Sequence, residues 1–326
     1  MASPLIEDVD WISKETAKAL KDAGMISVLD LALAPKNLLL KHGVTPETAA
    51  NITAEAVSEI KHLQQGSSLL GKERQRRKIS TGSSSLDNLL GGGISSGRVT
   101  EVYGESGAGK TQLCFQLCVN LLAAEQQQKK KEKDGDEEEE GKSDVVFIDT
   151  AGTFRPERLA QMAADRISDD GLFKHIFLVN ARSSEEQIRA VQSSQESTSL
   201  NIRMLVIDTL TDNFVYEFQG ESHITSRQTS LAHHLHDLVE MALDMDIPVV
   251  VTNTVRMRIL DTGETHVIET GGNTVAQGVH LRLRLERLKG KGKGWVARLD
   301  DADIKTIPRV RFKIEKNGIM DWEEEE

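Results

Sequence analysis

The most informative segment of this 326-residue chain reads Gly104-Glu105-Ser106-Gly107-Ala108-Gly109-Lys110-Thr111. An apolar run, Val99–Tyr103, precedes it, and a helix-like run, Gln112–Ala124, follows it. The pattern G-x4-G-K-S/T between a strand and a helix is typical of a phosphate-binding loop, whose backbone N–H groups surround a triphosphate. In that pattern the lysine reaches the β and γ phosphates and the threonine hydroxyl binds Mg²⁺. The sequence therefore predicts that this chain binds a nucleotide.

A second predicted strand, Met204–Asp208, ends in a carboxylate. Parallel strands end at one edge of their sheet, where the aspartate of phosphate-loop enzymes binds Mg²⁺ together with the loop hydroxyl. Asp208 is therefore the candidate metal-binding carboxylate, and Thr111 is the candidate hydroxyl. A third run, Val145–Thr150, is expected to end at the same edge, ahead of a helix with Pro156 in its first turn.

Apolar strand-like runs alternate with helical patterns from Ile79 onward. The runs are Val99–Tyr103, Val145–Asp149, His175–Val179, Met204–Asp208 and Pro248–Thr252. Near-continuous apolar strands separated by helices predict an α/β fold, with a mainly parallel sheet and helices on both faces.

The N-terminal part has a different pattern, with four short helices predicted at Lys14–Ala23, Val28–Ala34, Pro35–Lys41 and Pro46–Lys61. We therefore expect a small all-α domain over residues 1–64, a polar linker over 65–78 and the phosphate-loop core over 79–326. Residues 126–142 within the core are lysines followed by acids. Such a low-complexity run cannot bury a core, so we expect a disordered insert there.

The formal net charge is −11, which is unusual for a protein that binds nucleic acid. Residues 125–142 and 321–326 together carry −8 of this charge, so the rest of the chain is nearly balanced. Basic residues gather in residues 72–78, 282–287 and 289–293. Such clusters, more than the total charge, determine whether nucleic acid binds, although each one alone is also compatible with a solvated surface.

Other features exclude some classes of protein. No apolar run approaches the roughly 20 residues of a membrane span, and the N-terminus lacks a signal-peptide pattern, so we expect an intracellular protein without membrane contact. The two cysteines, Cys114 and Cys118, are too few for a metal site and are expected to be buried apolar residues. His233, His234 and His236 are expected to lie on a helix as surface and packing residues.

Further motifs follow one another in a specific order. They are Ile79-Ser80-Thr81-Gly82, Leu86-Asp87, Leu89-Leu90-Gly91-Gly92-Gly93-Ile94, the phosphate loop, Ile148-Asp149-Thr150, Gly152–Arg158, Val206-Ile207-Asp208, Val251-Thr252-Asn253, Gly271-Gly272-Asn273 and Ile314–Ile319. Together they resemble the RecA-like recombinase family of archaea and eukaryotes, which comprises archaeal RadA and its paralogues, over essentially the whole chain. The resemblance implies a RecA-like ATPase core and an N-terminal helix-hairpin-helix domain, of whose two hairpins only the second keeps a glycine, Gly43.

The resemblance also implies roles for individual residues, with ATP and Mg²⁺ as cofactors. The ATP-binding residues would be Gly104, Glu105, Ser106, Gly107, Ala108, Gly109, Lys110 and Thr111. Lys110 and Asp208 would be catalytic, and Thr111 and Asp208 would bind the metal. Arg158 matches the arginine that lies against the adenine ring.

Two segments match the family's DNA-binding loops, residues 214–227 and residues 255–270. Their arginines Arg227, Arg256 and Arg258 are the candidates for DNA contact, because a guanidinium pairs bidentately with phosphate. The implied partners are single-stranded DNA, double-stranded DNA, and either further copies of this chain in a filament or a related recombinase. The implied location is the nucleus in a eukaryote, or the cytoplasm and nucleoid in an archaeon.

Four departures from the family pattern bear on function. Ala151 replaces the glutamate that positions the attacking water, so hydrolysis should be slow unless Asp149, Glu157 or a neighbouring subunit substitutes. Thr254 replaces the glutamine that senses the γ phosphate. Gly66-Ser67-Ser68-Leu69-Leu70 stands where the family has Phe-x-x-Ala. Residues 256–268 alternate around a turn and predict a formed β-hairpin in the second loop.

Two functions remain open at this point. One is a DNA-dependent ATPase that coats single-stranded DNA as a filament and pairs it with duplex during homologous recombination and repair. The other is a paralogue that hydrolyses little ATP and helps a true recombinase load onto DNA. The motifs of the fold fit both functions, and Ala151, Thr254 and the absent Phe-x-x-Ala favour the paralogue. A phosphate-loop kinase or signalling ATPase without a DNA role is a more remote third alternative.

Overall fold

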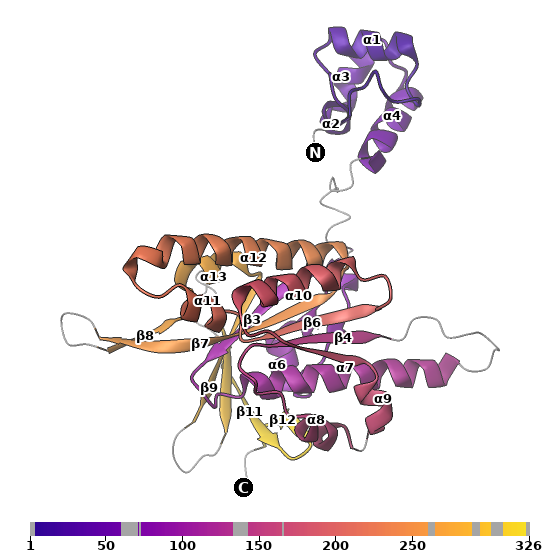
Figure 1. Cartoon of the computed structure of the whole chain (residues 1–326). Helices are drawn as coiled ribbons and strands as arrows, with labels where there is room; N and C mark the ends of the chain where they lie inside the picture. The colour runs from indigo at the N-terminus through magenta and orange to yellow at the C-terminus, as the bar shows by residue number, and fades with distance from the viewer. Residues whose placement is uncertain are drawn as a thin grey trace. The chain divides into compact units, whose positions relative to one another are not determined.

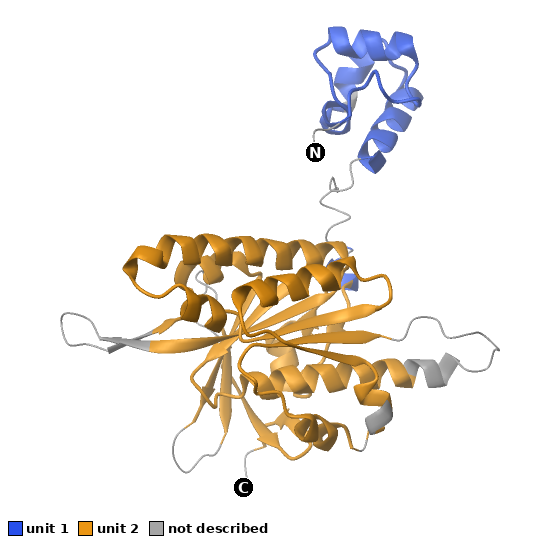
Figure 2. Cartoon of the chain, in the orientation of Figure 1, with its two compact units in different colours: residues 1–75 blue, residues 76–326 orange. Residues whose placement is uncertain are grey.

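The computed structural model describes residues 4–59, 71, 73–132, 143–164, 166–259, 265–288, 294–300 and 309–323. The chain divides into two compact units, residues 1–75 and residues 76–326 (Figure 2). Each unit has hydrophobic core residues of its own. Of the predicted linker, residues 65–70 and 72 lie outside the described residues.

The first unit contains α1 (Lys14–Asp22), α2 (Val28–Leu33), α3 (Lys36–Lys41) and α4 (Pro46–Glu59). Capping side chains explain where the first two begin. The Ser13 hydroxyl accepts a hydrogen bond from the Thr16 amide, and Ser27 and Asp30 form a reciprocal capping box. Each of these helices ends within two residues of its predicted bounds.

The second unit is built on one large sheet (Figure 1). Among the described residues, ten strands form it in the order β12-β11-β10-β9-β3-β7-β6-β4-β5, and β8 pairs with β7. The strands are β3 (Arg98–Gly104), β4 (Asp144–Asp149), β5 (Ile176–Asn180), β6 (Ile202–Asp208), β7 (Pro248–Ile259), β8 (Thr265–Glu269), β9 (Leu281–Arg287), β10 (Trp295–Leu299), β11 (Arg309–Glu315) and β12 (Gly318–Asp321). A short pair, β1 (Lys78–Ile79) and β2 (Ile94–Ser95), lies outside it.

The strands from β9 to β5 run parallel, whereas β10, β11 and β12 are antiparallel to their neighbours. The predicted α/β class with a mainly parallel sheet is therefore confirmed. The antiparallel extension at the C-terminal end was not predicted, since its strands alternate polar and apolar residues and lack the continuous apolar runs used to find the others.

Helices cover both faces of this sheet (Figure 1). One face carries α10 (Ser184–Glu196), α11 (Asp212–Glu217), α12 (Ile224–Asp244) and α13 (Gly272–Gly278); the other carries α6 (Ser84–Leu89), α7 (Lys110–Glu132), α8 (Pro156–Ala163) and α9 (Asp169–Phe173). Strand β6 shows why its sequence is apolar throughout: Met204 and Val206 belong to one core, and Leu205 and Ile207 to the other.

Helix α7 is longer than predicted. Its apolar pattern ends at Ala124, but the helix continues to Glu132, so residues 126–132 of the predicted disordered insert are helical. These residues are glutamines, lysines and a glutamate, which are good helix formers, and no glycine or proline interrupts the run before Gly135. The remaining residues of the predicted insert, 133–142, lie outside the described part of the chain.

The three histidines of α12 are surface and packing residues, as predicted. His233 and His236 are exposed, whereas His234 is 1% exposed and its ring lies beside Phe214. The Gln187 amide nitrogen donates to Leu210 O and lies 3.2 Å from His234 Nε2, which must therefore be the acceptor. His234 is thus neutral, and burial lowers its pKa to about 4.

We expect His234 to make the protein less stable in acid. Because the folded-state pKa lies below the ordinary value of 6.5, the unfolded chain binds the proton more tightly. The stabilising contribution is fully present above pH 6.5 and is lost as the pH falls toward 4, where the loss of stability amounts to about 3 kcal/mol. Chemical denaturation of the parent and His234→Gln at pH 7.5, 5.5 and 4.5 measures it. An equally steep loss of stability in the variant would contradict this assignment.

Candidate functional site

The phosphate loop connects the carboxyl end of β3 to the start of α7. Two of its glycines are required by close approach of other segments. A Cβ on Gly104 would lie 2.2 Å from Leu285 O, and one on Gly109 would lie 2.7 Å from Ile314 Cδ1. Both glycines also have positive φ, at 155° and 95°. The loop is therefore closely packed against β9 and β11, and larger residues would displace its backbone.

Lys110 folds back over this loop. Its side chain is mostly buried, and Nζ donates hydrogen bonds to Gly104 O at 2.9 Å and to Glu105 O at 3.0 Å. Burial lowers its pKa, and the nearby carboxylate of Asp208 opposes that effect. The ammonium group is thus held at the loop by two carbonyls, and no carboxylate forms a salt bridge with it among the described residues.

Asp208 lies at the end of β6 and accepts hydrogen bonds from two hydroxyl groups. Oδ2 accepts a hydrogen bond from Thr111 Oγ1 at 2.7 Å, and Oδ1 accepts one from Thr252 Oγ1. Burial raises the pKa of Asp208, while these two hydrogen bonds and Lys110 oppose the increase. The predicted metal-binding pair, Thr111 and Asp208, is therefore in direct contact.

A carboxylate and a hydroxyl are hard oxygen donors of the kind that Mg²⁺ prefers. Within the described ranges, no group of three or more His, Cys, Asp or Glu side chains could hold a metal ion. Mg²⁺ commonly takes one or two protein ligands and completes its shell with water and substrate phosphates. The residues present therefore suit a nucleotide with its Mg²⁺ ion.

Asp149, at the end of β4, holds the turn that follows it. Its Oδ1 accepts from the amides of Ala151 (3.1 Å) and Gly152 (2.9 Å), and its Oδ2 accepts from the amide of Phe154 (2.8 Å). Ala151 is exposed at this turn. Three backbone hydrogen bonds engage both oxygens of Asp149, which leaves that carboxylate poorly suited to replace a water-positioning glutamate.

Arg158, on α8, connects three segments. Nε donates to Gln112 Oε1 at 2.7 Å, while Nη1 and Nη2 donate to the carbonyls of Lys316 (2.7 Å) and Glu315 (2.6 Å). Burial lowers the pKa of this guanidinium group. The predicted adenine-contacting residue is therefore fixed between the first turn of α7 and the turn that joins β11 to β12.

The first predicted DNA-binding loop is largely helical. It contains part of α11, the 3₁₀ turn Glu221–His223 and the start of α12. Arg227, on α12, is partly buried and donates from Nη1 to Phe218 O at 3.3 Å. This arginine braces the loop internally, so its guanidinium is less available to a ligand than the sequence suggested.

The second predicted loop contains the predicted hairpin. Strands β7 and β8 pair antiparallel, with Arg256 opposite Ile268 and Arg258 opposite His266 in the backbone register. Arg256 is exposed. The two strands confirm the hairpin prediction, and its turn, residues 260–264, lies outside the described residues.

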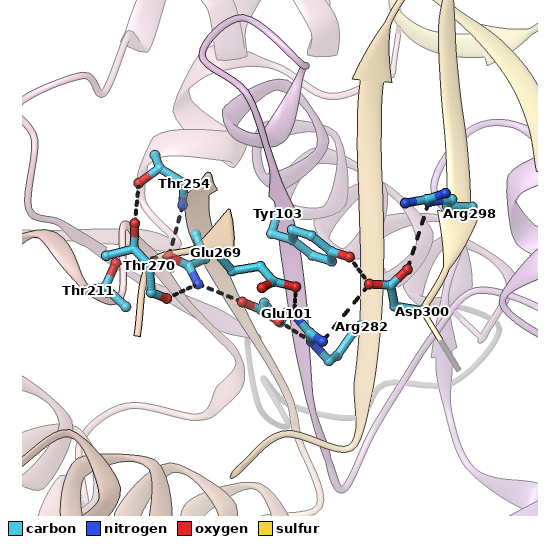
Figure 3. A network of polar contacts seen from close by, with 10 residues as sticks. Glu101, Tyr103, Thr211, Thr254, Glu269, Thr270, Arg282, Arg298 and Asp300 are labelled. Carbon is cyan, nitrogen blue, oxygen red and sulfur yellow. Dashed lines mark hydrogen bonds and ion pairs between the residues drawn. The ribbon is translucent and has the colours of Figure 1, made fainter. Parts of the chain in front are cut away.

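A buried polar network lies between this hairpin and the sheet (Figure 3). Arg282, on β9, donates from Nε to Glu101 Oε2 and from Nη2 to Glu269 Oε1, both at 2.7 Å. Its guanidinium carbon lies 4.8 Å from the centre of the Tyr103 ring, and the Tyr103 hydroxyl donates to Asp300. Burial raises the pKa of Glu101, and its hydrogen bonds from Arg282 and Asn253 oppose this.

Several arginines of the predicted basic clusters therefore have internal partners. Besides Arg282, Arg284 pairs with Glu286 at 2.7 Å, and Arg76 donates to Ser96 O. The network itself was missed from the sequence. One signal was present, because Glu101 interrupts an otherwise apolar strand, and a charge buried in a sheet needs a partner.

The fold and the site define a phosphate-loop nucleotide-binding protein with a RecA-like core. A family model described as Rad51 matches residues 72–322, and the chain belongs to this family. The match confirms the recognised RecA-like recombinase family and supports a general role in recombination and repair. Proteins of the family are ATPases that bind DNA and form oligomeric filaments. Among the described residues, no helix is both long enough and apolar enough to span a membrane.

Replacing Lys110 with alanine is expected to weaken ATP binding by about 10- to 100-fold, because hydrogen bonds from a charged group contribute about 1.5–3 kcal/mol. Titration with a fluorescent ATP analogue measures the affinity, and circular dichroism checks the fold. The matched control is Lys18→Ala, which removes an exposed lysine of α1. If the affinity of Lys110→Ala stays within a few-fold of the parent, the phosphate-loop assignment is wrong.

Proposed function

We propose that this chain binds ATP with Mg²⁺ and single-stranded DNA, and acts in homologous recombination and repair as an assembly or mediator protein with weak hydrolysis. One observation carries the proposal. The Lys110 ammonium at the loop and the contact between Thr111 and Asp208 support a nucleotide site, but the turn after β4 presents a methyl group at Ala151.

The nucleotide part of the proposal rests on three groups. The loop amides and Lys110 would hold the phosphates, Thr111 and Asp208 would hold Mg²⁺, and Arg158 would lie against the base. When bound, ATP with Mg²⁺ supplies the γ-phosphoryl group and the cation that neutralises its charge. The protein's own contribution is a rigid cradle and a buried carboxylate at the sheet edge.

Weak hydrolysis follows from the chemistry of the turn after β4. An alanine side chain neither accepts a proton nor orients water, and Asp149 already binds three amides. Of the two described carboxylates near the turn, Asp149 is buried and Glu157, on α8, is exposed. We therefore propose that ATP acts mainly as a bound ligand that stabilises an assembly.

Restoring the carboxylate tests this directly. A water-positioning group contributes roughly 10²–10⁴-fold in rate, so Ala151→Glu should raise DNA-stimulated hydrolysis by at least about tenfold. ATP affinity should change little, because the new side chain extends from an exposed position of the turn. Phosphate release with and without single-stranded DNA is the measurement.

Ala151→Gln is the matched control, since it has the same size without the carboxylate. If the parent already hydrolyses ATP at a rate typical of the family and Ala151→Glu leaves it unchanged, another group positions the water. Glu157→Gln would then be the next variant, and the mediator function would lose its main support.

The DNA part of the proposal rests on the hairpin. Charge reversal at Arg256 and Arg258 should weaken single-stranded DNA binding and reduce the magnitude of the slope of log affinity against log salt by about 1.4, because two phosphate contacts are removed at about 0.7 each. Reversal of the three lysines Lys129–Lys131, in α7, is the control. Fluorescence anisotropy at several salt concentrations gives both quantities, and equal effects from the two sets would contradict the hairpin assignment.

The recombinase remains the second candidate function, because every motif of the fold is kept. A DNA-stimulated ATPase combined with regular filaments in negative-stain images would favour it. Binding of ATP without appreciable turnover, together with short or mixed assemblies, would favour the mediator. Copies of this chain or a related recombinase are the proposed partner subunits in either case.

A further inference from the structure

Among the described residues, β7 is the strand that joins the second-loop hairpin to the large sheet. Within the sheet, strand β7 pairs with β3 and β6. It then continues beyond them into the hairpin. Strand β8 has β7 as its single strand neighbour within the described part of the chain. The return strand therefore needs another attachment if the hairpin is to hold one orientation.

Glu269, the last residue of β8, supplies this attachment by its ion pair with Arg282. The position of Arg282 is itself fixed. It stands beside Glu101 in the parallel register of β9 and β3, and binds that fully buried carboxylate through Nε. The Tyr103 ring lies against the guanidinium group. Glu269 is thus anchored to a cation that the centre of the sheet holds in place.

The neighbouring backbone is held by the same cluster (Figure 3). Asn253 Nδ2 donates to Glu101 Oε1 and to Thr270 O, both at 2.7 Å. The Thr270 amide in turn donates to Thr254 O at 2.9 Å. The base of the hairpin is therefore attached by the ion pair at Glu269, by the side-chain hydrogen bond from Asn253 to Thr270 O, and by the backbone hydrogen bond from Thr270 to Thr254.

We propose that the Glu269–Arg282 ion pair is a tether that fixes the hairpin in its DNA-binding conformation before nucleotide or DNA binds. Glu269 and Arg282 are positioning residues, because they act through the placement of Arg256 and Arg258. The tether involves no group of the nucleotide site, and the Thr254 hydroxyl, at the position of the family's phosphate-sensing glutamine, lies 3.4 Å from Thr270 Oγ1 at the hairpin base. The DNA consequence rests on the proposed function.

The direction in which a substitution at Glu269 changes DNA affinity separates this proposal from simple electrostatics. Glu269 is an acid at the base of a loop proposed to bind an anion, so removal of its charge alone should strengthen DNA binding. Loss of a tether should instead weaken binding, since the hairpin must then be ordered when DNA binds. Glu269 is also the safer residue to change, because removing Arg282 would leave the buried Glu101 without its cation.

The experiment compares Glu269→Ala and Glu269→Gln with the full-length parent. The matched control is Glu286→Gln, which removes an acid from the Arg284–Glu286 pair of β9 and leaves the hairpin base intact. Amide hydrogen exchange without DNA or nucleotide should become at least about tenfold faster at residues 265–269 in Glu269→Ala. Glu269→Gln keeps a neutral acceptor for Arg282, so its exchange rate should lie between those of the parent and Glu269→Ala.

Single-stranded DNA affinity without nucleotide should fall by about tenfold in Glu269→Ala, with an unchanged salt slope and an ATP affinity within about twofold of the parent. Glu286→Gln should bind DNA as well as the parent or slightly better. An unchanged salt slope distinguishes lost positioning from lost phosphate contacts.

Unchanged exchange in Glu269→Ala, or tighter DNA binding with no change in exchange, would overturn the tether. The proposed function fails in a different way. If the parent does not bind single-stranded DNA, or reversal of Arg256 and Arg258 has no effect, the DNA role is wrong, and faster exchange in Glu269→Ala would still support a tethered hairpin.

Discussion

The buried carboxylate of Glu101 constrains the middle of this molecule. A charge in the centre of a sheet is costly unless it is paired and hydrogen-bonded, and removing one partner of such a pair costs about 3–5 kcal/mol. Arg282 and Asn253 satisfy both oxygens of Glu101. These same two residues hold Glu269 and Thr270, so the requirement to neutralise one acid also fixes the base of the second loop.

Parallel pairing explains why the nucleotide site and the two loops lie together. Strands β3, β6 and β7 are neighbours, and their carboxyl ends lead into the phosphate loop, Asp208 and the hairpin. Asn253 extends this connection, because its Oδ1 accepts from Thr211, just before α11, at 2.9 Å. The geometry needed for a shared site is therefore a property of the sheet register, while its chemistry depends on a few side chains at the strand ends.

Local patterns in the sequence predicted those elements whose periodicity reflects burial. Strands covered on both faces, such as Met204–Asp208, are continuous apolar runs, and the phosphate loop has a fixed spacing. The proximity of Thr111 and Asp208 was also predictable from the sequence, because parallel strands end at the same edge of the sheet. The Glu101–Arg282 pair did not, because 181 residues separate its members and either charge alone resembles surface. Half-polar strands such as Arg309–Glu315 were missed because they lack the continuous apolar runs that identified the covered strands.

The distribution of charge along the chain bears on DNA binding. A net charge of −11 argues against DNA binding only if the charges act together, and they do not. Arg282, Arg284 and Arg76 are engaged with internal partners, whereas Arg256 of the hairpin is exposed. The DNA site that we propose on this hairpin needs a fixed orientation to be effective, and the ion pair at its base is the tether that we propose for it. Together with a nucleotide site in which Ala151 replaces the water-positioning acid, this proposed DNA site is the arrangement that we expect of a protein that stabilises assemblies.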